Sequence, residues 1–185
     1  MIPHPNRKPV RTTLPAIAIV AAITLLSGCA NIEKMTALKF KDKCTYVGRD
    51  DFEKKTKVFT DTHIYVRGFP LWYEGYYFFA QKRDNEEIDY QLIFETVYTG
   101  GWGFWKSAKD QNGKQFSLSR FQSGIYDTRM WERYAVHLSR EYLEGIRKTG
   151  ITWRFYRDSP RTSTPTLLPQ MIDGFLMRVD ETFKE

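Results

Sequence analysis

Residues 88–99 most constrain the fold of this chain, because two kinds of position alternate along them. One set is aromatic, aliphatic or threonine: Ile88, Tyr90, Leu92, Phe94, Thr96 and Tyr98. The positions between them hold Asp89, Gln91, Ile93, Glu95, Val97 and Thr99. Successive side chains of a β-strand point to opposite faces, so this period of two predicts a strand with one aromatic face turned inward. The fold must therefore contain a sheet with a buried face.

Further strands are predicted on both sides of this segment, between residues 44 and 138. The composition favours one or two strands within residues 57–67 and another at residues 72–82. Residues 83–86 form a polar stretch typical of a hairpin loop. Residues 110–113 predict a second turn, because Asn and Gly tolerate the positive φ angles that tight turns require. Strands joined by such turns favour an antiparallel sheet.

The last third of the chain combines strands with a helix. Residues 131–138 favour a strand, Ser139 is a good N-cap, and a helical apolar pattern then continues to Gly150. Residues 151–156 predict another strand. Because twelve residues are about the minimum for a crossover between parallel strands, residues 131–157 could form a β-α-β unit.

Residues 168–183 predict an amphipathic C-terminal helix. Its apolar stripe consists of Met171, Ile172, Phe175, Leu176, Val179 and Phe183. Pro169 suits the first turn of the helix. Gly174 costs about 1 kcal/mol relative to alanine there, which suggests that a neighbouring element approaches closely. The expected fold class is α+β, with a mainly antiparallel sheet in one or two layers and this helix packed on it.

The N-terminus has the features of a secretory signal. Arg7, Lys8 and Arg11 make residues 1–13 basic, and residues 14–26 are almost entirely apolar. Thirteen helical residues rise about 20 Å, which is short of the roughly 30 Å hydrocarbon core of a bilayer. We therefore expect the segment to be removed rather than to remain as a membrane-spanning helix.

The apolar segment ends in Leu26, Ser27, Gly28 and Cys29, a sequence that resembles the lipobox of bacterial lipoproteins. The resemblance covers the residues up to about Ala30. It implies a diacylglyceryl group on the Cys29 sulfur, cleavage before Cys29 and acylation of the new amino group. In well-studied Gram-negative bacteria, Ala30 instead of Asp at the next position further implies transfer to the outer membrane. We expect the anchored domain to face the periplasm.

The expected domain organisation follows from this leader. Residues 1–28 are a cleaved signal peptide, residues 29–43 a lipidated cysteine and tether, and residues 44–185 a single globular domain. Fully extended, the tether could reach about 46 Å. Alternatively, part of it could form an interfacial helix whose lysines, Lys34, Lys39, Lys41 and Lys43, face anionic headgroups.

Charge and cysteine content narrow the expected partners. Loss of the three basic residues of the leader lowers the formal net charge from +6 to about +3, so the basic composition is poor evidence for nucleic-acid binding. The expected envelope location also argues against a nucleic-acid partner. If Cys29 is lipidated, Cys44 is the only remaining thiol. It is expected to be a small buried hydrophobe, or alternatively to form a disulfide with another protein.

Candidate binding residues lie in two aromatic clusters and one basic segment. Trp72 belongs to residues 69–79, and Trp102 and Trp105 to the glycine-rich residues 100–105. Such clusters can be core, a partner or ligand surface, or a membrane contact. Arg154 and Arg157, with the neighbouring Arg147, Lys148 and Arg161, could bind phosphates or carboxylates, or could be scattered surface charge.

No catalytic motif accompanies these residues. His63 and His137 are the histidines that follow the leader, and neither lies in a metal-binding or triad pattern. We assign no catalytic residue, metal or cofactor, although catalytic groups can also meet only in three dimensions. The leading hypothesis is a non-enzymatic, lipid-anchored envelope protein that binds another envelope protein or a cell-wall component. A glycan or small-molecule binding domain is the alternative, and a hydrolase comes third.

Overall fold

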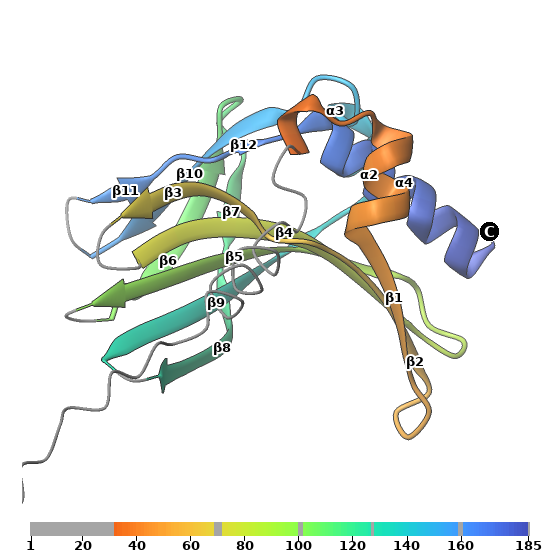
Figure 1. Cartoon of the computed structure of the whole chain (residues 1–185), viewed down its shortest axis with the longest axis horizontal. Helices are drawn as coiled ribbons and strands as arrows, with labels where there is room; N and C mark the ends of the chain where they lie inside the picture. Colours follow the sequence, from red (N-terminus) through yellow and green to blue (C-terminus); the bar gives the residue numbers. More distant parts are fainter. Residues whose placement is uncertain (1–31, 69–71, 100–101, 127, 159–160, 185) are drawn as a thin grey trace, which may run out of the picture.

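The computed structural model describes residues 32–68, 72–99, 102–126, 128–158 and 161–184. Two antiparallel sheets and a small group of helices make up this part of the chain (Figure 1). The predicted α+β class with a mainly antiparallel sheet and a C-terminal helix is confirmed. Among the described residues, no helix is both long and apolar enough to cross a membrane.

The larger sheet contains seven strands within the described residues. In spatial order these are β1 (Thr45–Asp50), β2 (Lys55–Thr60), β4 (Trp72–Arg83), β5 (Asp89–Thr99), β9 (Arg129–Leu138) and β8 (Ser119–Tyr126), while β3 (His63–Gly68) also pairs with β4. The strand predicted at residues 88–99 is thus the central strand β5. Its neighbours β4 and β9 pair with it in antiparallel register along almost its whole length.

The smaller sheet covers part of the inner face of the larger one. Its strands are β11 (Thr162–Ser163), β10 (Ile151–Arg157), β6 (Trp105–Asp110) and β7 (Gln115–Ser117), while β12 (Thr166–Leu167) also pairs with β10. Phe94 of β5 stacks on Phe155 of β10 with ring centroids 4.0 Å apart. Aromatic side chains therefore join the two layers.

The C-terminal helix α4 (Pro169–Phe183) covers the rest of this face, across β1, β2 and β4. Phe175 is fully buried and stacks on Phe78 of β4 with centroids 5.4 Å apart. The predicted apolar stripe is buried except for Phe183, which is half-buried. A Cβ atom on Gly174 would lie 2.6 Å from the carbonyl oxygen of Ala37, so the close approach expected at this glycine is confirmed.

The segment expected as a tether is instead part of the packed domain from Ile32 onward. It forms η1 (Ile32–Lys34) and α2 (Ala37–Cys44), and α2 lies beside α4 (Figure 1). Ile32 and Phe40 are buried, and Arg178 donates a hydrogen bond to the carbonyl oxygen of Lys41 at 3.1 Å. The apolar residues that look scattered in the sequence fall on one helical face. The expected boundary at residue 44 is therefore corrected to one at or before Ile32.

The strand–helix–strand order within residues 131–157 is present, but it is not a parallel crossover. β9 belongs to the larger sheet and β10 to the smaller, and each pairs only with antiparallel neighbours among the described strands. The helix between them, α3 (Arg140–Ile146), has seven residues and carries the chain from one layer to the other. The whole connection is near the lower limit for a crossover, so a change of layer is the easier path.

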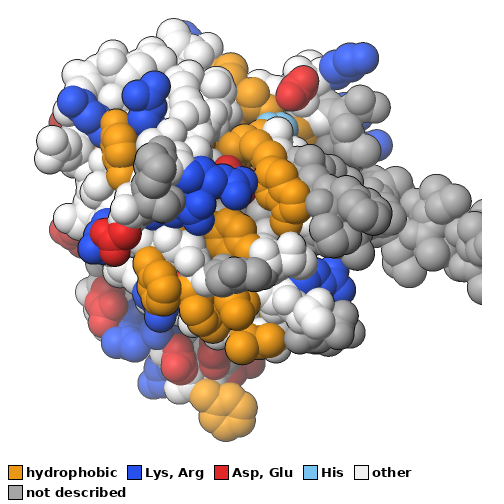
Figure 2. Space-filling model, turned by 90° about the vertical axis from the view of Figure 1, so that its left-hand side faces the viewer, with side chains coloured by type: hydrophobic (Ala, Val, Ile, Leu, Met, Phe, Trp, Pro, Cys, Tyr) orange, Lys and Arg blue, Asp and Glu red, His pale blue; other side chains and the backbone are white. Residues whose placement is uncertain are grey.

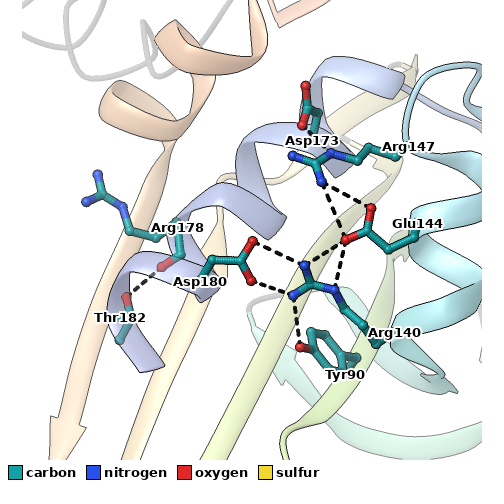
Figure 3. A network of polar contacts seen from close by, with 8 residues as sticks. All are labelled: Tyr90, Arg140, Glu144, Arg147, Asp173, Arg178, Asp180 and Thr182. Carbon is teal, nitrogen blue, oxygen red and sulfur yellow. Dashed lines mark hydrogen bonds and ion pairs between the residues drawn. The ribbon is translucent and has the colours of Figure 1, made fainter. Parts of the chain in front are cut away.

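Ion pairs hold α3 against α4 (Figure 3). Arg140 donates hydrogen bonds to Asp180 at 2.6 Å, to Glu144 at 2.7 Å and to the Tyr90 hydroxyl at 3.3 Å. Arg147 reaches both Asp173 and Glu144. Burial alone would lower the pKa of Arg140, but these acceptors, Asp180 first, raise it well above its ordinary value. Both arginines are thus occupied in fixing the helices.

Candidate functional site

A turn at residues 102–105 projects from the end of the sheets where β3 and β5 finish and where β4, β6 and β9 begin (Figure 1). Figure 2, which views this end, shows hydrophobic side chains with Lys and Arg side chains between them. Within the turn, Trp102 is half-buried, Gly103 and Trp105 are buried, and Phe104 is 49% exposed. Phe104 is therefore the side chain that the turn presents most openly.

A buried glutamate fixes the backbone on one side of Phe104. Glu132 of β9 is fully buried, and its Oε2 accepts a hydrogen bond from the Gly103 amide at 2.5 Å. Its Oε1 accepts one from the Tyr134 hydroxyl at 2.8 Å, and this hydroxyl accepts one from the Trp105 amide at 3.2 Å. We call Glu132, Tyr134 and the two amides the turn clamp. It holds the residues before and after Phe104 to the same strand.

The clamp holds Phe104 in a strained conformation. Its φ angle is +50°, in the left-handed region that bulky side chains rarely adopt. A Cβ atom on the adjacent Gly103 would lie 2.6 Å from the Tyr98 hydroxyl and 2.8 Å from Glu132 Oε2, so only glycine fits there. Strain of this kind costs of order 1–3 kcal/mol and persists where the surroundings fix it, often at functional sites.

Three arginines lie over aromatic rings around this turn. The guanidinium carbon of Arg161 is 5.0 Å from the centroid of Trp72, that of Arg157 is 5.4 Å from Trp105, and that of Arg120 is 5.5 Å from Phe104. These separations are within the range of cation–π attraction. We call the group formed by these arginines and the exposed or half-buried aromatics the strand-end surface; its members are Trp72, Trp102, Phe104, Arg120, Arg157 and Arg161.

The carboxylates beneath this surface are buried. Glu74, Thr96 and Glu132 lie side by side on β4, β5 and β9, all on the inner face of the sheet. Glu74 accepts hydrogen bonds from Ser163 and from Arg161 at 3.3 Å, and Arg120 reaches Glu132 at 3.4 Å. Two acids are thus covered while three guanidinium groups extend above them.

Tyrosine hydroxyls complete the buried layer in their neutral form. Burial raises the pKa of Tyr98 to about 12 and also raises that of Tyr65. Tyr98 accepts a hydrogen bond from the indole of Trp105 at 2.5 Å, and Tyr65 lies 2.5 Å from the Ser163 hydroxyl. The neighbouring Thr96 lowers the pKa of Tyr98, although the Thr96 hydroxyl has no hydrogen-bond partner of good geometry among the described residues. At neutral pH these hydroxyls therefore position side chains without adding charge.

The residues predicted from sequence are only partly brought together. Trp72, Trp102 and Arg157 are half-buried and lie at the strand-end surface, whereas Trp105 is 3% exposed and belongs to the core. Arg154 is exposed on β10, and its strand neighbours Trp153 and Phe155 face the other way into the core. Since Arg147 lies in the α3–α4 network, the basic segment does not form one site. Cys29 lies outside the described residues.

Neither His63 nor His137 joins this surface. His137 is exposed, as expected, and its Nδ1 lies 2.8 Å from Asp89. His63 packs edge-on against Tyr76, and burial lowers its pKa. Within the described ranges, no three His, Cys, Asp or Glu side chains are placed to hold a metal ion. The strand end thus presents exposed or half-buried rings and cations above buried acids.

Comparison with known proteins gives no match to any family model, curated protein or solved structure. The functional argument therefore depends on the sequence and on the geometry described above.

Proposed function

We propose that this chain is a lipid-anchored cell-envelope protein that binds another envelope component through the strand-end surface. One observation carries the proposal: an exposed phenylalanine, Phe104, is held in a strained conformation by a buried glutamate. A domain with no use for an exposed ring at this position would be more stable with a relaxed turn. The strain is understandable if the ring must be presented to a partner.

The chemistry of the surface favours a protein partner with apolar and acidic side chains. Aromatic residues and arginine are enriched among the side chains that contribute most to protein–protein binding. Here Trp72, Trp102 and Phe104 offer apolar area, while the arginines above the buried acids offer positive charge. Guanidinium groups are well suited to bind carboxylates. We therefore infer an acidic, partly apolar surface on the partner.

The envelope location rests on the resemblance of Leu26 to Cys29 to a lipobox. Replacing Cys29 by serine removes the sulfur to which the lipid would be attached. The variant should remain unprocessed or leave the membrane, as fractionation and the mass of the mature protein would show. Normal processing with full membrane retention would contradict the proposed anchor.

Site-specific photocross-linking in intact envelopes tests the binding surface. A photoreactive phenylalanine analogue at Phe104 should give a discrete protein adduct. The same analogue at Phe52, a fully exposed ring in the turn between β1 and β2, serves as the matched control. Equal adducts from both positions, or none from Phe104 in a correctly localised protein, would refute the strand-end surface as the contact.

A further inference from the structure

The outer face of the smaller sheet, turned away from the larger one, contains two adjoining hollows. On β10, Trp153 and Phe155 point into the core, so Arg154 and Tyr156 point outward. One hollow measures about 480 Å³ and the other about 290 Å³, and both are lined by Lys109 and Tyr156. The larger volume is within the usual range for small-molecule sites. We call the surface around these hollows, with Lys109, Arg154 and Tyr156 at its centre, the small-sheet face.

Two cations lie side by side at the centre of the small-sheet face. Arg154 of β10 is directly opposite Lys109 of β6, and both side chains are exposed. Residues paired in this way have Cβ atoms about 4.5–5.5 Å apart, and like charges there destabilise a sheet. Among the described residues, neither side chain has an ion-pair or hydrogen-bond partner, whereas the nearby Lys106 is paired with Asp158 at 2.5 Å. The arrangement is understandable if an anion binds between the two cations.

The one acid among the described residues that line these hollows is occupied elsewhere. Asp110 is 4% exposed, and it accepts hydrogen bonds from the Asn112 and Lys114 amides and, at 3.0 Å, from the Tyr142 hydroxyl. Its carboxylate is therefore used in the turn after β6 and in the contact with α3. The two cations of the small-sheet face are thus left without a paired carboxylate in the part of the chain that the structure describes.

A tyrosine ring and several hydroxyls surround the cations. Tyr156 is the next outward residue after Arg154 on β10, and it is half-buried. Around it the linings contribute hydroxyls and amides: Ser107, Gln111, Gln115, Ser117, Thr152 and Thr164. An aromatic ring offers a flat apolar surface to a small cyclic ligand, while hydroxyls and amides both donate and accept hydrogen bonds. Such a surface suits the ring and hydroxyls of a sugar.

We infer that the small-sheet face binds a phosphorylated sugar, with the phosphate between Lys109 and Arg154 and the sugar ring against Tyr156. A phosphate monoester carries a charge of about −1.5 to −2 at pH 7, which matches two cations, whereas a carboxylate would balance only one. Arginine can bind phosphate through two parallel donors, and lysine binds it as a point charge. The inference goes beyond the proposed envelope contact, because the small-sheet face and the strand-end surface share no residue.

Calorimetric titration of the full-length protein in detergent tests this assignment with four probes. Glucose 6-phosphate has both parts of the ligand, glucose and inorganic phosphate have one part each, and glucuronate has a sugar ring with a single negative charge. Glucose 6-phosphate should bind about tenfold or more tightly than each of the other three. Failure of glucose 6-phosphate to bind the folded protein would overturn the inference, and so would equally tight binding of any other probe.

Variants locate the binding on the small-sheet face. Arg154→Gln and Lys109→Gln should each weaken glucose 6-phosphate binding about tenfold or more. Neither should lower the melting temperature of the free protein, because each removes one of two opposed like charges. Tyr156→Ala should weaken glucose 6-phosphate binding but leave the weaker binding of inorganic phosphate unchanged.

A matched control separates the site from general charge attraction. Lys148→Gln removes an exposed positive charge just after α3 and should bind glucose 6-phosphate like the wild type. Unchanged affinity in both Arg154→Gln and Lys109→Gln, or an equal loss in Lys148→Gln, would contradict the site.

The photocross-link at Phe104 separates this inference from the proposed function. If glucose 6-phosphate fails to bind while the Phe104 adduct still forms, only the site on the small-sheet face is wrong. If glucose 6-phosphate binds as expected and the adduct is missing, this site stands and the protein–protein contact falls.

Discussion

Replacing Glu132 by alanine should destabilise the domain by about 2–6 kcal/mol. The carboxylate is fully buried, so its removal leaves the Gly103 amide and the Tyr134 hydroxyl without their acceptor. Each buried donor left unpaired costs about 1–3 kcal/mol. The lost ion pair with Arg120 adds little, because that arginine is 46% exposed and the pair is screened by water.

The size of this effect makes it easy to measure. For a domain of this size, 1 kcal/mol shifts the melting temperature by about 2–4 °C, so a loss of 4 kcal/mol should lower it by about 8–16 °C. Glu132→Gln should cost less, because the amide retains one acceptor for the Gly103 amide. Glu141→Ala, at an exposed position in α3, is the control and should change stability by less than about 0.5 kcal/mol.

Thermal unfolding and amide hydrogen exchange would together show whether Glu132 holds the turn as the clamp predicts. In Glu132→Gln the Gly103 and Trp105 amides should exchange faster than in the wild type, because the turn clamp is weakened. The Phe104 cross-link should weaken in the same variant, since the ring is held less firmly in its strained conformation. A Glu132→Ala protein with wild-type stability and unchanged protection at Gly103 would refute the clamp.

Four further changes test the packing of the helices. Gly174→Ala should destabilise the protein by about 1–3 kcal/mol although alanine is the better helix former, because its Cβ would lie 2.6 Å from the Ala37 carbonyl oxygen. Gly145→Ala is the control: a Cβ atom built at this position meets no neighbouring atom within 4 Å, so alanine should stabilise the protein by about 0.5–1 kcal/mol. If urea denaturation shows that both variants lose stability, the packing argument is refuted. Phe175→Ala should cost about 3–5 kcal/mol in the same assay, and a change below 1 kcal/mol would contradict its place in the core. Burial alone would raise the pKa of Glu144, but hydrogen bonds from Arg140 and Arg147 lower this pKa below its ordinary value of 4.5. The ionised carboxylate therefore stabilises the fold above pH 4.5, and this stabilisation is lost as the pH falls through the lowered pKa. Glu144→Gln should therefore lose less stability than the wild type between about pH 5 and pH 3, and parallel losses would argue against the ion pair.

The main elements of the fold can be predicted because their patterns are local. Alternation at residues 88–99 identifies the central strand, and the apolar stripe of residues 168–183 identifies α4. The packing of α2 is harder to predict, since Phe40 and Ile32 are buried by α4 from the far end of the chain. The layer change between β9 and β10 is also set by tertiary pairing, which a strand–helix–strand pattern does not determine.

The candidate site depends even more on contacts between distant residues. Glu132 and Gly103 are 29 residues apart, and a buried glutamate runs against the usual exposure of charged side chains. One signal is nevertheless present in the sequence. Glu74 shares the inward phase of its strand with Tyr76 and Phe78, as Glu132 does with Tyr134. An acid on the apolar phase of a strand identifies a position where a special partner is needed.

Because the chain is already packed at Ile32, an anchor at Cys29 would leave little room between the body and the bilayer. Three residues span at most about 10 Å, whereas the tether expected from sequence could reach about 46 Å. The volume that the domain could explore around its lipid would then be about a hundredfold smaller, and the effective concentration of a neighbour within reach correspondingly higher. Such a protein would not reach partners that lie deeper in the periplasm, away from the membrane surface. It would meet only what lies in the layer directly above its own leaflet.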